Sequence, residues 1–345
     1  MTPTPSKILV VRNDRIGDFM LAYPTFLLLK RALPRCEIHC LVPDYTREMA
    51  ECCPAINLAI RDPGPDAGLR EQLGLLRRLR RERYDAVITL YSTIRVGLLA
   101  VAAGIRYRLA PATRIAQLFY NQRLRQRRSH SDKPEYEYNL DVARCLLADI
   151  GMANVVPPAP PFLQFPPGEV ALLRTAFCQG RGIDPGDRLV FVHPGSGGSA
   201  SNLSPSQYAM LVHELHSRRP HTVVITAGPG EENGAGRVAA LLHGRAHTIY
   251  HSTGGLTRFA QHIQFADLFI SGSTGPLHIA GALDRPTAAF YTRRRSATAL
   301  RWQTLNCAER RLAFSPPENA APEDMSTVDV AGAAKIISRT FLKDL

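Results

Sequence analysis

The sequence predicts an α/β protein built on doubly wound parallel sheets. Short apolar runs, rich in β-branched residues, recur along the chain with helical segments between them, which is the order that a parallel sheet requires. A proline-rich stretch near the middle separates two series of such elements. The 345 residues are enough for two domains that each bury a core of their own.

The first series begins with residues 7–12, a continuous apolar run that is typical of a strand buried on both faces. The polar segment 13–18 follows it and leads into a helix predicted over 19–32, which only Pro24 interrupts. Two more strands are predicted, over 37–42 and 86–90. Three more helices are predicted, over 45–52, 70–82 and 135–149.

Six prolines fall within the thirteen residues 155–167. Proline lacks a backbone N–H and therefore cannot continue through the interior of a sheet or a helix. We expect an interdomain linker here. The predicted organisation is an N-terminal domain over 1–154, a linker over 155–168, a C-terminal domain over 169–327 and an amphipathic helix over 328–345.

The second series repeats the plan of the first. Ser204 followed by Pro205 is a good helix start, with serine as the N-cap, and leads into a helix over 207–217. Further helices are predicted over 256–265 and from Pro276 onward. Strands are predicted over 188–193, 222–226, 268–270 and, as the last one, 286–291.

Two carboxylates follow the first strand, where a doubly wound fold places its chemistry. Asp18 can act there as a general base, as a charge at a helix N-terminus or as a simple turn residue. Asp14 competes for the same roles. The pattern alone does not choose between them.

Three loops of the second series are candidates for binding a phosphorylated ligand. The glycine-rich turn 194–200 offers backbone N–H groups that can approach a diphosphate, although it matches neither GxGxxG nor a Walker loop. Glu231 and Glu232 follow a strand end, where a carboxylate can hold ribose hydroxyls or simply start a helix. The turn 271–275 places backbone N–H groups at the positive end of the next helix, where they can bind an anionic ligand. The alternative is an ordinary strand-to-helix connection with no ligand.

Composition and charge restrict the function. No apolar run approaches the length of a membrane span and no signal-peptide pattern opens the chain, so we expect a cytoplasmic protein. The seven cysteines show neither metal-ligand nor disulfide spacing. The net charge of +12 is concentrated in one acid-free stretch, which predicts contact with nucleic acid, an anionic membrane or a phosphorylated glycolipid, unless it is a merely solvated face. Its arginines are Arg106, Arg108, Arg114, Arg123, Arg125, Arg127 and Arg128.

Three motifs, taken in order, resemble glycosyltransferase family 9, the family of the lipopolysaccharide heptosyltransferases. They are residues 8–19, 193–197 and 271–283. The resemblance implies a GT-B architecture, in which two Rossmann-like domains face each other across a cleft. It also implies an inverting transfer from ADP-heptose to the lipopolysaccharide inner core on lipid A, without a metal ion or cofactor. Such an enzyme is peripheral to the inner face of the cytoplasmic membrane and has no nucleic-acid partner.

The resemblance assigns the catalytic base to Asp18 and so decides between the two carboxylates. It places the donor at the second and third motifs and the acceptor at the basic stretch. The implied donor site is Ser196, Gly197, Gly198, Ser199, Glu231 or Glu232, Ser273, Thr274, Gly275 and His278. The implied acceptor site is Arg15, Arg106, Arg108, Arg114, Arg123 and Arg125.

Two departures from the family pattern leave the donor open. Ser273 stands where the family usually has an aspartate, and 201–203 lacks the usual basic residue, which Arg293, Arg294 or Arg295 could replace. The alternatives are another nucleotide sugar, another glycan acceptor, or a catalytically silent glycolipid binder. A nicotinamide-dependent dehydrogenase is disfavoured because no GxGxxG follows the first strand.

Overall fold

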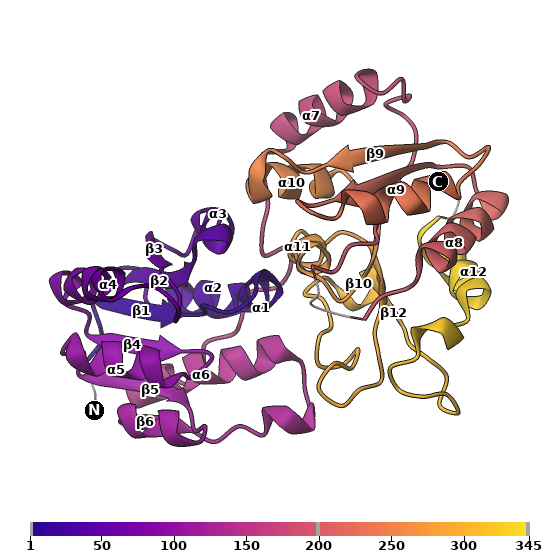
Figure 1. The fold of residues 1–345 in the computed structure, drawn as a ribbon. Coiled ribbons are helices and arrows are strands. Elements are labelled where there is room, and N and C mark those ends of the chain that lie inside the picture. Colours follow the sequence, from indigo (N-terminus) through magenta and orange to yellow (C-terminus); the bar gives the residue numbers. More distant parts are fainter. Residues whose placement is uncertain (1–2, 198–200, 343–345) are drawn as a thin grey trace. The chain divides into compact units, whose positions relative to one another are not determined.

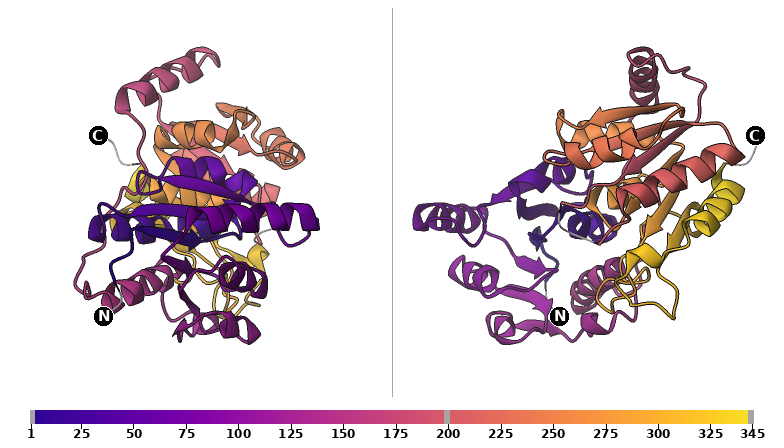
Figure 2. Two further views of the ribbon diagram at one scale, coloured as in Figure 1. Left: turned by 90° about the vertical axis from the view of Figure 1, so that its left-hand side faces the viewer. Right: turned by 45° about the vertical axis from the view of Figure 1, so that its right-hand side comes forward.

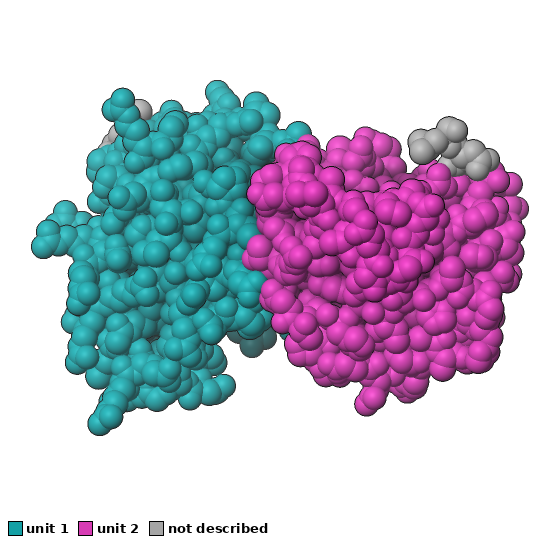
Figure 3. Space-filling model, turned by 90° about the horizontal axis from the view of Figure 1, so that it is seen from above, with its two compact units in different colours: residues 1–128, 132–159 teal, residues 129–131, 160–345 magenta. Residues whose placement is uncertain are grey.

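The structure is a computed structural model that describes residues 3–197 and 201–342. The chain divides into two compact units, which Figure 1 and Figure 3 show. Unit 1 comprises residues 1–128 and 132–159, and unit 2 comprises 129–131 and 160–345. The main division therefore falls inside the proline-rich stretch. None of the helices in the described residues is long and apolar enough to cross a membrane.

Unit 1 is built on a six-stranded sheet in the order β3-β2-β1-β4-β5-β6, and all its strand pairs are parallel. This is the doubly wound order of a Rossmann-like fold. The strands are β1 (Lys7–Val11), β2 (Glu37–Pro43), β3 (Leu58–Asp62), β4 (Ala86–Thr89), β5 (Tyr107–Pro111) and β6 (Gln122–Leu124). The helices are α1 (Ile16–Met20), α2 (Tyr23–Ala32), α3 (Arg47–Glu51), α4 (Leu69–Glu82), α5 (Ile94–Ala102) and α6 (Glu135–Asp149), with 3-10 turns η1 (Asp44–Thr46), η2 (Ile115–Phe119) and η3 (Arg128–His130).

Unit 2 repeats this topology with the order β12-β11-β10-β7-β8-β9, again entirely parallel. Figure 2 shows that helices cover the sheets on both faces. The strands are β7 (Leu189–His193), β8 (Thr222–Ala227), β9 (His247–His251), β10 (Leu268–Gly272), β11 (Thr287–Phe290) and β12 (Arg311–Phe314). The helices are α7 (Pro167–Gln179), α8 (Pro205–Arg218), α9 (Glu232–Ala240), α10 (Gly255–Gln264), α11 (Gly275–Ala282) and α12 (Val330–Phe341), with 3-10 turns η4 (Ala308–Arg310) and η5 (Met325–Thr327).

Each sheet packs its apolar side chains against amphipathic helices. In unit 1, Leu9 and Val11 of β1 form a core with Leu75 and Leu79 of α4 and Val96 of α5. In unit 2, α8 and α12 contribute to the same core as the central strands. The last helix, α12, begins at Val330, where the Asp329 carboxylate caps it by accepting from the amide of Gly332 at 2.9 Å.

Two sequence predictions need correction. The helix predicted over 19–32 is two helices, because the chain turns at Leu21 and Ala22 and Pro24 then takes the second position of α2, where its missing N–H is not needed. As a result, Asp18 lies in the first turn of the short helix α1. The strand predicted as the last one, β11, is followed by β12, an edge strand whose residues are only partly buried.

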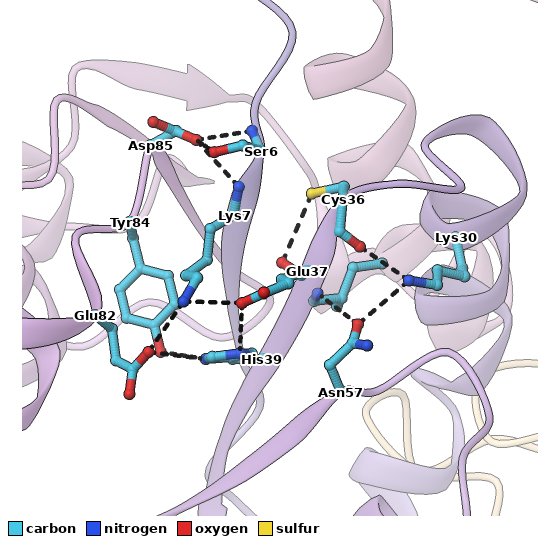
Figure 4. A network of polar contacts seen from close by, with 11 residues as sticks. Ser6, Lys7, Lys30, Cys36, Glu37, His39, Asn57, Glu82, Tyr84 and Asp85 are labelled. Atoms are coloured by element: carbon cyan, nitrogen blue, oxygen red, sulfur yellow. Dashed lines mark hydrogen bonds and ion pairs between the residues drawn. The ribbon is translucent and has the colours of Figure 1, made fainter.

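A polar network ties together the amino ends of β1, β2 and β4 (Figure 4). The Lys7 ammonium lies 2.8 Å from the Glu37 carboxylate and 3.1 Å from that of Glu82. His39 Nδ1 lies 2.9 Å from the hydroxyl of Tyr84. This network fixes the strand register at the edge of the sheet opposite to the one that carries Asp18.

Candidate functional site

The polar motifs lie at the carboxyl edges of the two sheets, where the strand order reverses direction. In unit 1, residues 13–18 follow β1, which pairs with both β2 and β4. In unit 2, His193 ends β7 and pairs in register with Ser271 of β10. Open parallel sheets bind ligands in the crevice outside such switch points. Each unit therefore carries a candidate site at its own switch point.

The unit 1 site is organised by one buried arginine. Arg12 directly follows β1 and is 2% exposed. Its Nη2 donates to Asp18 Oδ1 at 2.5 Å, and its Nε lies 2.9 Å from Asp14 Oδ1. Its Nη1 donates to Glu135 Oε1 and to Asn139 Oδ1, both at 3.1 Å and both on α6. The Arg12 guanidinium thus links Asp14 and Asp18, the two candidate bases, to helix α6.

The pKa values of Asp14 and Asp18 are both raised. Burial raises the pKa of Asp18 above the usual aspartate value, while the positive charge of Arg12 opposes that rise. Burial also raises the pKa of Asp14 to about 7, again against Arg12. The side chains of Asp14 and Asp18 are 22% and 16% exposed, so a ligand can reach them. A raised pKa makes a carboxylate better suited to act as a general base.

The loop that carries these carboxylates is anchored on its other side as well. Asn13 Nδ2 donates to the Asp62 carboxylate at the end of β3, at 2.5 Å. Asp62 also pairs with Arg95 of α5. The Tyr45 hydroxyl donates to the carbonyl of Asp14 at 2.9 Å. The segment 13–18 is therefore held between β3, α5 and α6.

The unit 2 site begins with a buried histidine and a glutamate. His193 Nδ1 lies 3.0 Å from the Thr226 hydroxyl, and its Nε2 lies 3.5 Å from Glu231 Oε2. Burial lowers the pKa of His193, while Glu231 opposes that change. The Glu231 carboxylate accepts from the amides of Gly197 at 3.1 Å and Gly228 at 3.0 Å. Glu231 therefore joins the glycine-rich turn to the loop after β8.

The glycine-rich turn leaves no room for a side chain beside Glu231. A Cβ at Gly195 would lie 2.2 Å from the carboxylate carbon of Glu231. Glu232 differs from its neighbour, because it is the first residue of α9 and accepts from the amide of Gly230 at 3.2 Å. Ser196 is half-buried and Gly197 is exposed, whereas Gly198 and Ser199 lie outside the described residues.

The turn after β10 packs against the same loop. The Ser271 hydroxyl donates to the His193 carbonyl at 3.0 Å and lies 3.0 Å from the Thr274 hydroxyl. Asn202 donates to the Pro194 carbonyl at 3.0 Å and accepts from the Tyr208 hydroxyl at 2.5 Å. Asn202, from the segment that lacks the family's basic residue, thus links the glycine-rich turn to α8.

Helix α11 starts at this edge and carries His278. Ser273 is half-buried before the helix, Thr274 is the buried N-cap residue and Gly275 is the first helical residue. His278 is 2% exposed, and its Nδ1 has no hydrogen-bond partner within the described part of the chain. Its ring lies edge-on to Trp302, with centroids 6.4 Å apart. Burial lowers the pKa of His278 to about 4, so the imidazole is neutral at pH 7.

The basic stretch does not act as one surface. The Arg108 guanidinium donates to the carbonyls of Phe119 at 2.9 Å and Ile105 at 2.6 Å, which turns it inward. Arg128 lies 2.6 Å from the Glu135 carboxylate, an acid that α6 supplies. Arg106 precedes β5 and so lies toward the amino edge, away from Asp18. Exposed arginines remain at positions Arg15, Arg106, Arg114, Arg123, Arg125 and Arg127.

The three arginines considered as replacements for the missing cation have different surroundings. Arg293 donates to the carbonyls of Pro317 at 2.8 Å and Ala320 at 2.7 Å, and so holds that loop. Arg294 lies 3.7 Å from Glu323, and Arg295 is exposed. Across residues 3–197 and 201–342, no group of three or more His, Cys, Asp or Glu side chains is arranged to hold a metal ion.

Comparison with known proteins identifies the family. The model for glycosyltransferase family 9 (heptosyltransferase) matches residues 73–306. The chain belongs to glycosyltransferase family 9. A Haemophilus influenzae protein named "Putative glycosyltransferase" is 43% identical to this family 9 enzyme over 311 residues, which cover 90% of this chain and 89% of the relative. The predicted family and the prediction of a glycosyltransferase are both confirmed.

More distant relatives share the whole architecture. Lipopolysaccharide heptosyltransferase 2 of Salmonella typhimurium is 25% identical over 298 residues, covering 83% of this chain and 82% of the relative. The solved structure of Escherichia coli ADP-heptose lipopolysaccharide heptosyltransferase II matches with a TM-score of 0.77 at 19% identity, covering 97% of this chain and 98% of that one. The predicted GT-B fold class of this family 9 enzyme is thereby confirmed.

Sequence reasoning missed the residues that hold the candidate base. Glu135 and Asn139 lie more than a hundred positions from Arg12, so spacing along the chain could not connect them. One signal was available in the sequence. The two residues are four apart on a helix whose neighbouring face is apolar, which places two polar side chains on a buried stripe. Such side chains need a polar partner, and here the partner is Arg12.

Proposed function

We propose that this enzyme transfers heptose from ADP-heptose to a hydroxyl of the lipopolysaccharide inner core, inverting the anomeric centre without a metal ion. Relatives named as lipopolysaccharide heptosyltransferases support the donor and the acceptor. The observation that carries the chemistry is the Asp18 carboxylate, which a buried arginine holds at the carboxyl edge of the unit 1 sheet. The reaction class needs one base on the acceptor side and stabilisation of the leaving diphosphate on the donor side.

Asp18 is the proposed base. Its carboxylate removes the proton from the acceptor hydroxyl while that oxygen forms a bond to the anomeric carbon of the donor. The bond from that carbon to the diphosphate breaks at the same time, and ADP leaves. Burial favours the protonated form of Asp18, whereas Arg12 favours the ionised form that the reaction requires. Arg12 is therefore a positioning residue in this mechanism, not a group that touches the substrate.

The proposed donor site is the carboxyl edge of the unit 2 sheet. The proposed diphosphate contacts are backbone amides of the glycine-rich turn at 196–199, except that of Gly197, which donates to Glu231. The start of α11 at Ser273, Thr274 and Gly275 can add hydrogen bonds and the helix dipole. His278 has a buried ring nitrogen without a partner in the described residues, so a ligand group can satisfy it. Glu231 is the proposed ribose contact in preference to Glu232, because its carboxylate faces the turn.

The proposed acceptor contacts are the exposed arginines. Arg15 belongs to the loop of the candidate base, and Arg114 and Arg125 follow the carboxyl ends of β5 and β6. These positions suit an acceptor whose phosphates and acidic sugars carry negative charge. Arg123 is placed along the edge strand and Arg106 toward the other edge, so we propose that they meet more distant anions. A lipid-linked acceptor places the enzyme at the inner face of the cytoplasmic membrane.

A thermal-shift panel with ADP, UDP, GDP, CDP and NAD, with and without Mg²⁺, tests the donor proposal. A ligand that binds only the folded state raises its melting temperature. Selective stabilisation by ADP, equal in EDTA and in Mg²⁺, is the expected result. Preference for UDP or GDP would overturn the donor while keeping the reaction class. A chain that responds to none of the nucleotides would instead be the silent glycolipid binder.

A further inference from the structure

The outward face of α5 is apolar. Ile94, Leu98 and Val101 are 45%, 49% and 44% exposed. Their spacing of four and then three residues places them in one stripe along the helix. Val96 and Ala100, on the opposite side, are buried in the core of unit 1. A surface helix normally turns polar residues outward, so this second apolar face requires an explanation.

The 3-10 turn η2 widens this stripe. Its side chains Ile115 and Leu118 are 63% and 67% exposed. Phe119, at the end of η2, lies directly against Gly97 of α5, where a Cβ would be 2.6 Å from the Phe119 Cβ. Only glycine permits this approach, which brings the exposed residues of η2 beside those of α5.

Polar contacts align the two elements along their length. At the start of α5, the Ser92 hydroxyl donates to the Pro111 carbonyl at 3.1 Å, just before η2. At the other end, Arg108 joins the carbonyls of Phe119 and Ile105. The two elements therefore run side by side in the same direction. Their exposed apolar residues form one surface, the α5–η2 strip, which consists of Ile94, Leu98, Val101, Ile115 and Leu118.

The surroundings of the strip are positively charged. Residues 86–131 contain eight arginines and neither aspartate nor glutamate. Arg114 directly precedes η2 and Arg106 closely follows α5, and both are exposed. Arg95 pairs with Asp62 from β3, so it contributes little free charge to this face. Apolar side chains rimmed by exposed arginines are complementary to a surface with a negative headgroup layer above an apolar interior.

We propose that the α5–η2 strip is the surface by which this protein docks on a lipid bilayer that contains anionic lipids. The five apolar side chains enter the interfacial region, and the neighbouring arginines bind the headgroups. A second copy of the chain fits this surface less well, because two arginine rims would face each other with like charge. The inference rests on the proposed function for its biological setting, since the proposed acceptor is a lipid, but its test uses neither donor nor acceptor.

Co-sedimentation of the full chain with vesicles tests this proposal. We expect binding to phosphatidylglycerol–phosphatidylethanolamine vesicles, little binding to phosphatidylcholine vesicles, and weaker binding as salt increases. Leu98→Glu and Leu118→Glu should each lower partitioning by about tenfold or more, since each loses the burial of a large apolar side chain. Arg114→Glu should lower it by about fivefold or more.

Matched controls come from unit 2. Leu172→Glu changes a leucine that is 74% exposed on α7, and Arg339→Glu changes an exposed arginine on α12; both should bind vesicles like the wild type. Equal losses in these controls, or no vesicle binding by the wild type, would overturn the proposal. A Leu118→Glu variant that turns a dimer into a monomer and still binds vesicles would show that the strip joins two copies.

The nucleotide response separates this inference from the proposed function. The thermal shift by ADP, measured without vesicles, should be the same for Leu98→Glu, Leu118→Glu and the wild type, which also shows that the variants fold. A wild type that binds vesicles but not ADP would contradict the proposed donor and leave the docking surface standing. A wild type that binds ADP but no vesicles would contradict the docking surface and leave the proposed donor standing.

Discussion

The Arg12 guanidinium donates to the Asp18 carboxylate at 2.5 Å from a position that is 2% exposed. Because the same guanidinium also contacts Glu135 and Asn139, it cannot follow a movement of Asp18 without breaking contacts to α6. The carboxylate is therefore held in one place and its charge is favoured. Both properties are required of a base that has to meet an acceptor hydroxyl in a fixed geometry.

Replacing Arg12 should destabilise unit 1 strongly. Arg12→Met removes one of the guanidinium partners of Glu135, whose side chain is 1% exposed. A buried charge that loses its partner typically lowers the free energy of unfolding by about 3 kcal/mol or more. Arg47→Met is the matched control, since it removes an exposed pair with Glu51 and should cost less than about 1 kcal/mol. Urea unfolding measures both free energies. Similar values for the two variants would contradict the role of Arg12.

The pH dependence of transfer should reveal the raised pKa of the base. Because Asp18 must be ionised to act, kcat/KM should rise with pH through an apparent pKa above the ordinary aspartate value of about 3.9. Glu135→Gln removes a negative charge that raises the pKa of Asp18, which favours the ionised form of Asp18 and should move this limb to lower pH. Arg15→Gln removes a positive charge and should move it to higher pH. Shifts of the same sign would refute this electrostatic explanation.

We expect His278 to lower the stability of the nucleotide-free protein and to contribute to binding of the donor. Its buried Nδ1 lacks a partner in the described residues, and an unsatisfied buried group costs about 1–3 kcal/mol. His278→Phe keeps a ring beside Trp302 and removes this group, so the nucleotide-free protein should melt at a higher temperature. The same variant should show a smaller stabilisation by ADP. An unchanged ADP response would place His278 outside the donor site.

A methyl group at Gly195 should weaken nucleotide binding, because it would collide with the neighbouring Glu231 carboxylate. In Gly195→Ala the new Cβ displaces the Glu231 carboxylate, which then loses the amides of Gly197 and Gly228. We expect ADP affinity to fall by about tenfold, the equivalent of one or two hydrogen bonds, with little change in melting temperature. Gly236→Ala in α9, where a Cβ meets nothing within 4 Å, should retain wild-type affinity. Equal affinities for the two variants would contradict this role of Glu231.

The sequence predicts the architecture well where strands are buried on both faces. Central strands such as β1, β7 and β10 are continuous apolar runs, and their positions are confirmed. Strands β3, β5, β6, β9 and β12 were not predicted. All of them except β5 stand at an edge of their sheet, where one side of a strand is solvated and the apolar pattern is weaker. The two units were recognisable because the same alternation of strands and helices starts again after the proline-rich stretch.

The candidate site was predictable only where its residues are neighbours in the sequence. Asp18 lies within a motif that follows a strand, so its place at the sheet edge could be expected. Its partner Glu135 comes from α6 and could be found only in three dimensions. The predicted basic surface was partly wrong for the same reason. Composition alone treats Arg108 and Arg128 as available charges, but in the fold Arg108 donates to backbone carbonyls and Arg128 pairs with the buried Glu135.

The most direct test is transfer from ADP-heptose to a de-acylated inner-core acceptor in the presence of EDTA, comparing the wild type with Asp18→Asn. The wild type should form a product whose linkage has the anomeric configuration opposite to that of the donor. Asp18→Asn keeps the shape of the side chain but cannot accept the proton, so its kcat should fall by about 10²–10⁴-fold while ADP still raises its melting temperature. Transfer at the wild-type rate by Asp18→Asn, or no transfer by the wild type with ADP-heptose, would contradict the account.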